Sequence, residues 1–379
     1  MRILHSADWH LGKLFYGRSL LEDQQHFIFH TFLPLVDEQP TDGVILAGDI
    51  YDRAVAPADA LRLFDRFVEE LCGKRGIPLY IAVGNHDGAD RFSLGSSLLA
   101  RQGLHIAARL PELPRLVLQD SETLIHLYLL PFFDLQTARY LLEDDDISTL
   151  GQAVQRLLQP VRAQLAPEAF NILVTHCFVS GAKMYTQEED VYVGTLQQID
   201  SGVFDGFDYV ALGHLHAPQS IGSLHYSGSP LKYSFDECNQ RKSVTELTVT
   251  GKQARLREIP VTPAHDVRVL TGSLQQLLDA AAYDPSPEDY LFAELTGAPA
   301  FEPMARLRAY YPNLLGLRNG VEPADTAQTR ARADLRAQLR RQQPDQEKIF
   351  TGFLTDICGT PPSEQDLQLF RQVCKEARP

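Results

Sequence analysis

The chain has 379 residues, with 35 Lys and Arg against 49 Asp and Glu, which gives a formal net charge of −14 at neutral pH. Its 44% hydrophobic and 22% charged residues are ordinary values for globular proteins, so a disordered chain and a coiled coil are excluded. A chain of this length provides for two or three domains. The acidic balance disfavours a protein that holds nucleic acid by general basic charge alone, but it allows a metal site or a partner that supplies positive charge.

The sequence contains no stretch that predicts membrane insertion. No window holds 18 consecutive apolar residues, which excludes a transmembrane helix. Met1 and Arg2 lead directly into an apolar run, so we expect no signal peptide. The cysteines are odd in number and include no CxxC pair; they are Cys72, Cys177, Cys238, Cys358 and Cys374. Reduced thiols in a cytoplasmic protein are therefore expected, and a disulfide framework or a zinc knuckle is not.

Up to residue 260, short apolar runs alternate with amphipathic stretches. Strands are expected at residues 1–5, 43–47, 79–83, 171–174 and 209–212. Helices are expected at residues 57–72 and 92–102. Continuous apolar runs of this length are typical of strands covered on both faces, as in α/β folds. Polar residues follow each run, at the position where open α/β sheets bind their substrates.

After Pro260 the sequence predicts a small, separate α+β module. Its strands would span residues 265–270, 289–295 and 314–318, and its helices residues 274–283 and 303–311. An Arg-rich stretch follows, and two helices over residues 344–357 and 363–377 end the sequence, with Ser363 and Asp366 as an N-cap pattern for the second. We therefore expect three parts, at residues 1–260, 261–323 and 324–379.

Five polar clusters come directly after the predicted strands. They are Asp8-Trp9-His10, Gly48-Asp49-Ile50-Tyr51-Asp52, Gly84-Asn85-His86-Asp87, Thr175-His176 and Gly213-His214-Leu215-His216. Each cluster alone is common in unrelated proteins, but the full ordered set is not expected by chance. Two Asp, one Asn and four His in these clusters offer oxygen and nitrogen donors without sulfur. This set is too large for one tetrahedral zinc, but it suits two metal ions that share a carboxylate, and such a centre would attract a phosphate.

This ordered set resembles the calcineurin-like metallophosphoesterase superfamily, whose pattern is D-x-H, G-D-x-x-D, G-N-H-D/E, a lone His and G-H-x-H. The resemblance implies an α/β fold in which a two-sheet sandwich is flanked by helices. It also implies two divalent metal ions per chain, with Mn²⁺ as the expected metal. The first ion would be bound by Asp8, His10 and His216, the second by Asn85, His176 and His214, and Asp49 would bridge both.

The same resemblance implies two catalytic residues that bind no metal. His86 would act on the substrate phosphate or on the leaving group, and Asp52 would orient that histidine. From the residues alone, Asp52 could instead be a turn residue that caps the next helix. Two-metal sites clamp the attacking and leaving oxygens of an in-line displacement, so the expected reaction is hydrolysis of a phosphoester.

Two longer segments narrow the resemblance to the SbcD family. They are Arg2–Gly12 and Gly228–Glu237, the second being more specific than the metal motifs. SbcD proteins are nuclease subunits of a bacterial double-strand-break repair complex. The resemblance therefore implies a cytoplasmic, nucleoid-associated DNA exonuclease and endonuclease.

Two other activities remain open. One is a phosphoprotein or small phosphodiester hydrolase, since Arg53 completes a G-D-x-x-D-R motif that phosphatases of the superfamily share, although Ala54 stands where those have Gly. The other is a metal-supported repair scaffold that needs no catalysis.

The resemblance also implies three kinds of contact. The α+β module would be a capping domain that touches DNA through Arg306, Arg308 and Arg318. A homodimer, as part of a heterotetramer, would form through Leu61, Phe64, Val68, Leu98 and Leu99. The C-terminal helical hairpin would bind the ATPase SbcC through Ile349, Phe350, Phe353, Leu354, Leu367, Phe370 and Val373.

Each of these contacts has an alternative that the sequence allows. The arginines could be ordinary surface residues, and the apolar face at residues 61–68 could belong to the internal core. The two C-terminal helices could fold back on their own domain. Two isolated helices cannot bury both of their apolar stripes, however, so a partner surface is expected.

Overall fold

The computed structural model describes residues 1–110, 113–184, 198–298 and 300–320, and from the C-terminal part residues 351, 362–364, 366–367 and 369–370. The chain forms two compact units. One comprises residues 1–293 and 302–317, and the other residues 294–301 and 318–379. All of the predicted metal ligands belong to the first unit.

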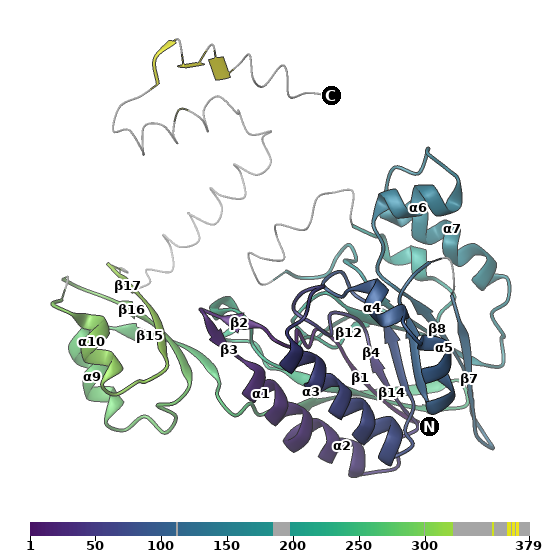
Figure 1. Cartoon of the computed structure of the whole chain (residues 1–379), viewed down its shortest axis with the longest axis horizontal. Coiled ribbons are helices and arrows are strands. Elements are labelled where there is room, and N and C mark those ends of the chain that lie inside the picture. The colour runs from purple at the N-terminus through teal and green to yellow at the C-terminus, as the bar shows by residue number, and fades with distance from the viewer. Residues whose placement is uncertain are drawn as a thin grey trace. The chain divides into compact units, whose positions relative to one another are not determined.

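Within the described residues, two six-stranded sheets form the body of the first unit (Figure 1). The first sheet has the order β14 (Gln253–Pro260), β13 (Ser243–Thr250), β1 (Arg2–Ser6), β4 (Gly43–Leu46), β5 (Leu79–Ala82), β6 (Leu104–Ala107). The second has the order β11 (Gln219–Ile221), β12 (Leu224–Tyr226), β10 (Tyr209–Gly213), β9 (Phe170–His176), β8 (Leu124–Leu130), β7 (Arg115–Gln119). The strands from β1 to β6 in the first sheet, and from β12 to β8 in the second, are parallel. Their carboxyl ends therefore share one edge of each sheet.

Alternation along the strands separates the two faces of each sheet. In β1 and β4, Ile3 and Ile45 face the other sheet and share a core with Ile172 of β9, whereas Leu4 and Val44 face the helices. All five side chains are fully buried. The continuous apolar runs of the sequence thus lie in strands covered on both faces, as predicted.

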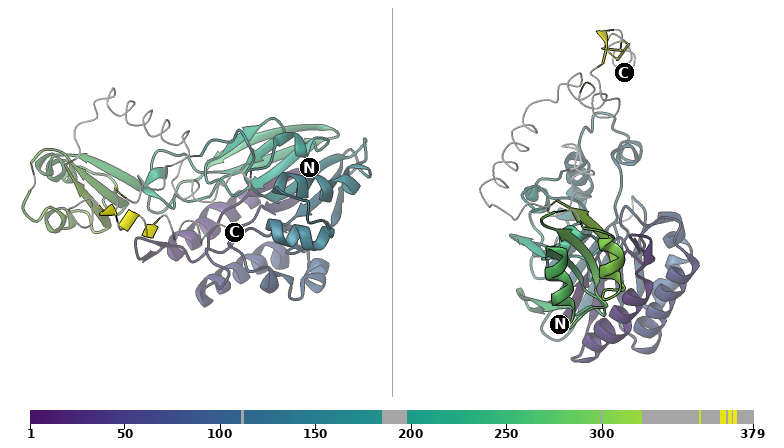
Figure 2. Two further views of the ribbon diagram at one scale, coloured as in Figure 1. Left: turned by 90° about the horizontal axis from the view of Figure 1, so that it is seen from above. Right: turned by 90° about the vertical axis from the view of Figure 1, so that its left-hand side faces the viewer.

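Helices cover the outer faces of the paired sheets (Figures 1 and 2). The first sheet packs against α1 (Leu21–His26), α2 (Leu33–Asp37) and α3 (Ala58–Val68), and the second against α6 (Leu135–Leu142) and α7 (Leu150–Arg162). The layers therefore run helix, sheet, sheet, helix, which confirms the predicted two-sheet α/β sandwich.

The predicted helix at residues 92–102 is instead divided into short pieces. These are α4 (Ala89–Ser93), α5 (Ser96–Leu99) and a 3₁₀ turn at Ala100–Gln102. Leu94 is extended and Gly95 adopts a left-handed φ of 73°, so the chain changes direction between the two helices. The predicted helix at residues 57–72 begins as α3 and ends as a π-helical stretch at Glu69–Lys74.

The α+β module after residue 260 has the five predicted elements. They are β15 (Val267–Gly272), α9 (Leu274–Ala281), β16 (Tyr290–Leu295), α10 (Pro303–Arg308) and β17 (Leu314–Asn319), with the strands in the order β15–β16–β17. Buried Asp23 of α1 joins the module to the sandwich. Its carboxylate lies 2.8 Å from His265 Nδ1 and accepts a hydrogen bond of 2.7 Å from the Tyr290 hydroxyl.

A few residues of the predicted C-terminal hairpin lie within the described part of the chain. Ile349, Phe350, Phe353, Leu354 and Val373 lie outside the described residues. Leu367 and Phe370 are helical and half-buried. The Ser363 hydroxyl accepts a hydrogen bond from the Asp366 main-chain N–H, which confirms the predicted N-cap.

Two predictions about composition can be examined in the described part of the chain. None of its helices combines the length and apolar character that crossing a bilayer requires. Its three cysteines, Cys72, Cys177 and Cys238, carry free thiols. Cys358 and Cys374 lie outside the described residues.

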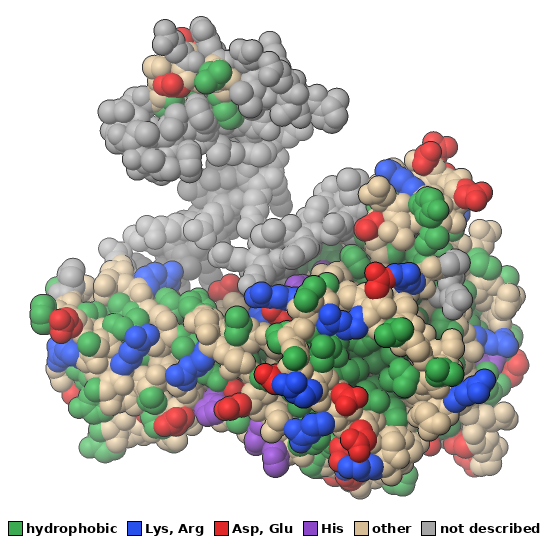
Figure 3. All heavy atoms as spheres, viewed as in Figure 1, with side chains coloured by type: hydrophobic (Ala, Val, Ile, Leu, Met, Phe, Trp, Pro, Cys, Tyr) green, Lys and Arg blue, Asp and Glu red, His purple; other side chains and the backbone are tan. Residues whose placement is uncertain are grey.

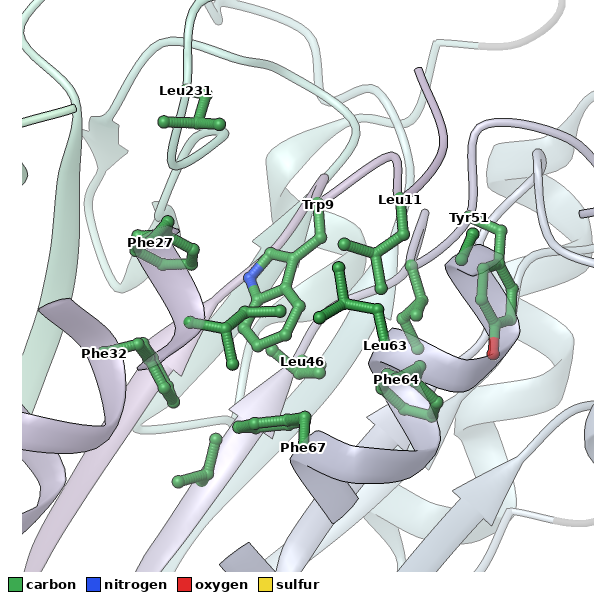
Figure 4. Packing of buried hydrophobic residues seen from close by; sticks show 14 of the residues in the cluster. Trp9, Leu11, Phe27, Phe32, Leu46, Tyr51, Leu63, Phe64, Phe67 and Leu231 are labelled. Carbon is green, nitrogen blue, oxygen red and sulfur yellow. The ribbon is translucent and has the colours of Figure 1, made fainter. Parts of the chain in front are cut away.

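An aromatic cluster fixes the loop that follows β1 (Figure 4). Trp9 is 1% exposed, and its ring centroid lies 4.9 Å from that of Phe67, 5.5 Å from that of Phe32 and 5.6 Å from that of Phe27. Its indole N–H donates to the Ser6 hydroxyl at 2.8 Å. Because Trp9 stands between Asp8 and His10, this packing holds two predicted ligands in place.

We predict that Trp9→Ala lowers the free energy of unfolding by about 3–5 kcal/mol, because it leaves a cavity in this cluster. Urea unfolding followed by circular dichroism measures the change. Tyr283→Ala is the matched control; the Tyr283 side chain is 89% exposed, so its removal should change stability by less than about 0.5 kcal/mol. Equal losses in the two variants would contradict the assigned role of Trp9.

Candidate metal centre

The two sheets bring the five polar clusters to one place. Asp8 and His10 follow β1, Asp49 follows β4, and Asn85 follows β5. From the second sheet, His176 is the last residue of β9, and His214 and His216 follow β10. The site therefore forms where the carboxyl ends of parallel strands from both sheets meet.

Three overlapping groups of side chains lie close enough to share a cation. They are Asp8 with His10 and His216, Asp8 with Asp49 and His176, and His10 with Asp49 and His86, and within each group one ligand atom per residue lies within 4.8 Å of the others. The Nε2 atoms of His10 and His216 lie 3.2 Å apart. The members of the predicted first metal site are thus brought together.

The second predicted set lies on the other side of Asp49. His176 Nε2 lies 3.0 Å, and His214 Nδ1 3.3 Å, from the Asn85 side-chain oxygen. The Asp49 Oδ2 atom lies 3.3 Å from His176 Nε2 and 3.8 Å from His10 Nε2. Asp49 therefore stands between the two donor sets, at the position that a bridging carboxylate requires.

The loops that carry the ligands have unusual backbone conformations. Asp8, His10, Asp49 and His214 all have positive φ angles, between 44° and 99°. A left-handed conformation costs a non-glycine residue of the order of 1 kcal/mol or more, and it persists only where the surrounding structure imposes it. Four of the predicted ligands are therefore held in strained backbone conformations by the surrounding structure.

Glycines allow these loops to approach one another. A Cβ atom on Gly213 would lie 1.8 Å from the Ala47 carbonyl oxygen, and one on Gly84 would lie 2.2 Å from the Asp49 carboxylate. Neither distance is possible between real atoms, so both positions require glycine. This explains the Gly before Asn85 and the Gly before His214 in the motifs.

Burial sets the electrostatics of the centre. Burial raises the pKa of Asp8 to about 6. Burial would also raise the pKa of Asp49, but His176, His10 and His86 hold it well below its usual value. Burial lowers the pKa of His214 to about 3, which favours the neutral imidazole that binds metals. Burial would also lower the pKa of His176, but Asp49 and Asp8 raise it to about 9, so a metal ion that binds its Nε2 atom must displace a proton. Buried carboxylates in close contact with imidazoles form a donor set that a cation stabilises.

The donor set fits a pair of divalent cations. All of its donor atoms are oxygen or nitrogen, a set that suits Mn²⁺, Fe²⁺ or Zn²⁺. The His176 Nδ1 atom lies 2.8 Å from the Ala47 carbonyl oxygen, which can only accept a hydrogen bond. Nδ1 therefore carries a proton, and Nε2 faces Asn85 and Asp49, where a metal ligand must point and where a bound cation would replace any proton on Nε2.

His86 lies beside these donors, and its ring contact differs from the predicted one. Its Nε2 atom lies 4.0 Å from Asp49 Oδ2, and its main-chain N–H donates to Asp49 Oδ1 at 2.9 Å. The Nδ1 atom lies 2.9 Å from the main-chain carbonyl oxygen of Asp52. The Asp52 carboxylate lies 3.1 Å from Lys13 Nζ and 3.8 Å from His10 Nδ1. Asp52 thus reaches His86 through its main chain, whereas its carboxylate faces Lys13 and His10.

Two further residues, not predicted from the sequence as part of the site, support the centre. The buried Asp87 carboxylate accepts main-chain N–H bonds from Tyr51, Gly84 and Ile50 at 2.9–3.3 Å, which ties the Asp49 loop to the Asn85 loop. Glu237 lies 3.0 Å from His216 Nδ1. Burial would raise the pKa of Glu237, but Lys242 and His216 lower it to about 2. Asp87 is the last residue of the Gly84–Asp87 cluster, and Glu237 is the last residue of the Gly228–Glu237 segment. Their places in these motifs were the sequence signal that could have pointed to them.

The arginines of the predicted DNA contact are exposed. Arg306 and Arg308 lie on α10, and the Arg308 Nε–H donates to the Leu314 carbonyl at 3.1 Å. Arg318 forms an ion pair with Glu294. Their positions at the surface are compatible with a DNA contact and equally with ordinary surface arginines.

The predicted dimer residues divide into two groups. Phe64 is buried in the core, and Leu61 and Val68 are half-buried. Leu98 and Leu99 are 70% and 39% exposed. A groove of about 470 Å³ is lined by Leu61, Phe64, Val68 and Leu99, among others. Hydrophobic side chains gather over α3 to α5 on this face (Figure 3).

Two family models match the chain. The calcineurin-like phosphoesterase model covers residues 1–218, which include every predicted metal ligand. The model of the SbcD C-terminal domain, described as the type 5 capsule protein repressor C-terminal domain, covers residues 263–356.

We predict that Asp49→Ala prevents binding of a metal pair, because Asp49 lies between the two donor sets. Calorimetric titration with Mn²⁺ should show fewer than two bound ions per chain. Asp59→Ala removes an exposed carboxylate on α3 and should leave the Mn²⁺ stoichiometry unchanged. Two tight sites in the Asp49 variant would exclude the bridging role.

Proposed function

The chain belongs to the calcineurin-like phosphoesterase family and is an SbcD-type metallophosphoesterase, and from this premise we propose that it is a metal-dependent DNA nuclease. It acts as an exonuclease on double-strand ends and as an endonuclease on single strands and hairpins. The observation that carries the proposal is the convergence of all predicted metal ligands beside His86, in a chain that also has an SbcD C-terminal domain.

The ligand assignment follows the two donor sets. Asp8, His10 and His216 would hold one divalent ion, Asn85, His176 and His214 would hold the other, and Asp49 would contribute to both, with Mn²⁺ as the proposed metal. When bound, two such ions activate a water and offset the charge that builds on a phosphate. The protein fixes the donors in advance through Trp9, Asp87 and the glycine contacts, so little reorganisation is needed for the ions to bind.

His86 acts on the substrate and binds no metal. Because the Asp52 carbonyl can only accept, the His86 Nδ1 atom carries a proton and the ring orientation is fixed. The Nε2 atom faces the Asp49 side of the centre. When it is protonated, it donates a hydrogen bond to a phosphate oxygen or a proton to the departing sugar oxygen.

Partners follow from the same assignment. The chain divides at residues 260 and 323. The capping module contacts DNA through Arg306, Arg308 and Arg318, and residues 324–379 connect the chain to the ATPase SbcC. The groove at α3 and the exposed Leu98 and Leu99 support a homodimer within a heterotetramer. The complex works in DNA end processing and double-strand-break repair, in the cytoplasm at the nucleoid.

Two alternatives make different predictions. A phosphoprotein or small phosphodiester hydrolase would cleave a phosphopeptide or bis-p-nitrophenyl phosphate but not DNA. A repair scaffold would bind metal and cleave neither. Incubation of the purified chain with end-labelled duplex, single-stranded and hairpin DNA, and in parallel with a phosphopeptide and bis-p-nitrophenyl phosphate, in Mn²⁺ and in Mg²⁺, with and without SbcC and ATP, separates the three. Cleavage of the small substrates alone would overturn the nuclease proposal.

We predict that His86→Ala keeps both metal ions but lowers the rate of DNA cleavage by about 10²–10⁴-fold, the usual contribution of a positioned general acid. Calorimetry with Mn²⁺ and a gel assay on end-labelled DNA measure the two properties. His30→Ala removes an exposed histidine and serves as the matched control. Loss of a metal ion in the His86 variant would make His86 a ligand and contradict its assigned role.

We predict that deleting residues 342–379 leaves a folded nuclease that binds two Mn²⁺ ions but no longer co-purifies with SbcC. Every ligand precedes residue 217 and both sheets end by Pro260, so neither should depend on the deleted part. Size-exclusion chromatography of the mixed subunits shows the result. Undiminished complex formation would place the SbcC contact elsewhere, and an insoluble product would assign the deleted helices to the core.

A further inference from the structure

The run Gly228–Glu237 packs against the main chain of His216. The Ser229 N–H donates to the His216 carbonyl at 3.1 Å. Gly228 has a φ of 73°, and a Cβ atom there would lie 2.7 Å from the same carbonyl oxygen. The run therefore packs directly on the main chain of His216, and only a glycine fits at position 228.

At the end of the run, Glu237 faces the ring of His216. Glu237 is 1% exposed, and its Oε1 atom lies 3.0 Å from His216 Nδ1. Its Oε2 atom accepts a hydrogen bond of 2.5 Å from Lys242 Nζ and one of 3.3 Å from the Tyr233 main-chain N–H. Both carboxylate oxygens are thus engaged, one by the imidazole and one by a cation.

Lys242 holds this carboxylate in place. It is 5% exposed, and besides Glu237 its ammonium lies 2.9 Å from the His216 carbonyl oxygen, 2.9 Å from the Ser229 hydroxyl and 2.7 Å from the Gln240 side-chain oxygen, so four acceptors share its three N–H protons. The Tyr233 ring packs edge-on against His10 and His216, with centroids 5.5 Å and 5.7 Å away. The imidazole of His216 is therefore fixed at its Nδ1 edge, at its main chain and at its face.

We propose that Glu237 is a positioning residue for the metal centre: it accepts the Nδ1–H of His216 and so directs the Nε2 lone pair toward the cation shared with His10 and Asp8. A neutral imidazole has a single lone pair, and the partner of one ring nitrogen decides which nitrogen carries it. The proposal rests on the metal centre of the proposed function and assigns a role to the Gly228–Glu237 run, which the metal motifs leave unexplained.

The competing explanation is that the Glu237–Lys242 pair only stabilises the fold. A buried ion pair is weak evidence for either role, because desolvation offsets much of the attraction between the charges. The two explanations differ in what removal of the charge does to metal affinity. A positioning carboxylate beside a metal-bound histidine typically contributes 10–100-fold to affinity, whereas a distant buried pair contributes nothing specific to one site.

The test is titration of the full-length chain with Mn²⁺ by calorimetry, together with thermal unfolding of the metal-free protein. We expect Glu237→Gln to weaken one of the two Mn²⁺ sites by about 10–100-fold and to leave the other near its wild-type affinity. Glu246→Gln is the matched control. Glu246 is also buried and pairs with Arg2 and Arg257 on the first sheet, so its loss should lower stability without weakening one Mn²⁺ site selectively.

Glu237→Gln also removes the charge that pairs with Lys242, so two further variants separate that effect from the loss of the contact with His216. Glu237→Asp keeps a negative charge for Lys242 but shortens the reach to His216, so it should fold and still weaken the same site. In a His216→Ala background, Glu237→Gln should cause no further loss of Mn²⁺ affinity, because the residue acts through His216. Additive losses would exclude that route.

The two proposals fail separately. A wild-type chain that binds two Mn²⁺ ions but cleaves no DNA overturns the nuclease function alone. Wild-type Mn²⁺ affinities in folded Glu237→Gln or Glu237→Asp overturn the role of Glu237 alone. Unfolding of both variants would assign Glu237 to the stability of the fold and equally overturn the proposal.

Discussion

The buried carboxylate of Asp49 is the constraint on which the rest of the site depends. It is 3% exposed at the junction of two sheets, where an unpaired charge would cost several kcal/mol. Groups from both sheets offset that cost. The main-chain N–H of His86, after β5 of the first sheet, donates to the carboxylate, and His176 Nε2, at the end of β9 in the second sheet, lies 3.3 Å from it. The glycine contacts and the left-handed loop conformations follow from bringing these groups so close to one carboxylate.

The sequence predicted those features that are encoded by residues close together in the chain. Strands covered on both faces appear as continuous apolar runs, and ligands at strand ends appear as short clusters in chain order. Contacts between residues far apart in the chain could not be predicted in this way. Glu237 contacts His216 only because the chain turns after β12. Asp87 accepts hydrogen bonds from main-chain N–H groups, which nearly every residue type has. The Asp52 carbonyl beside His86 is likewise invisible in a sequence, because every residue has a carbonyl.

Helical periodicity identified apolar faces but could not assign their neighbours. In α3, Phe64 packs on Phe67 and Phe92 inside the core, although its spacing from Leu61 and Val68 equally suits an interface. Farther along, Gly95 divides the expected helix, and the piece that follows exposes Leu98. Leu98 thus remains 70% exposed and Leu99 lines the groove beside α3, so the described residues of the chain leave this apolar face uncovered.

The Gly228–Glu237 run has two sides, and they contact different parts of the molecule. Glu237 contacts His216, and the Tyr233 hydroxyl donates to the Trp9 carbonyl, between the ligands Asp8 and His10. From the opposite side, Lys232 pairs with Asp266 at 2.8 Å, and Phe235 packs on Phe292 of β16. The α+β module and the first donor set therefore contact the same short loop. Because protein interiors are close-packed, a substitution that changes the path of this run would alter the packing of both the module and the first donor set.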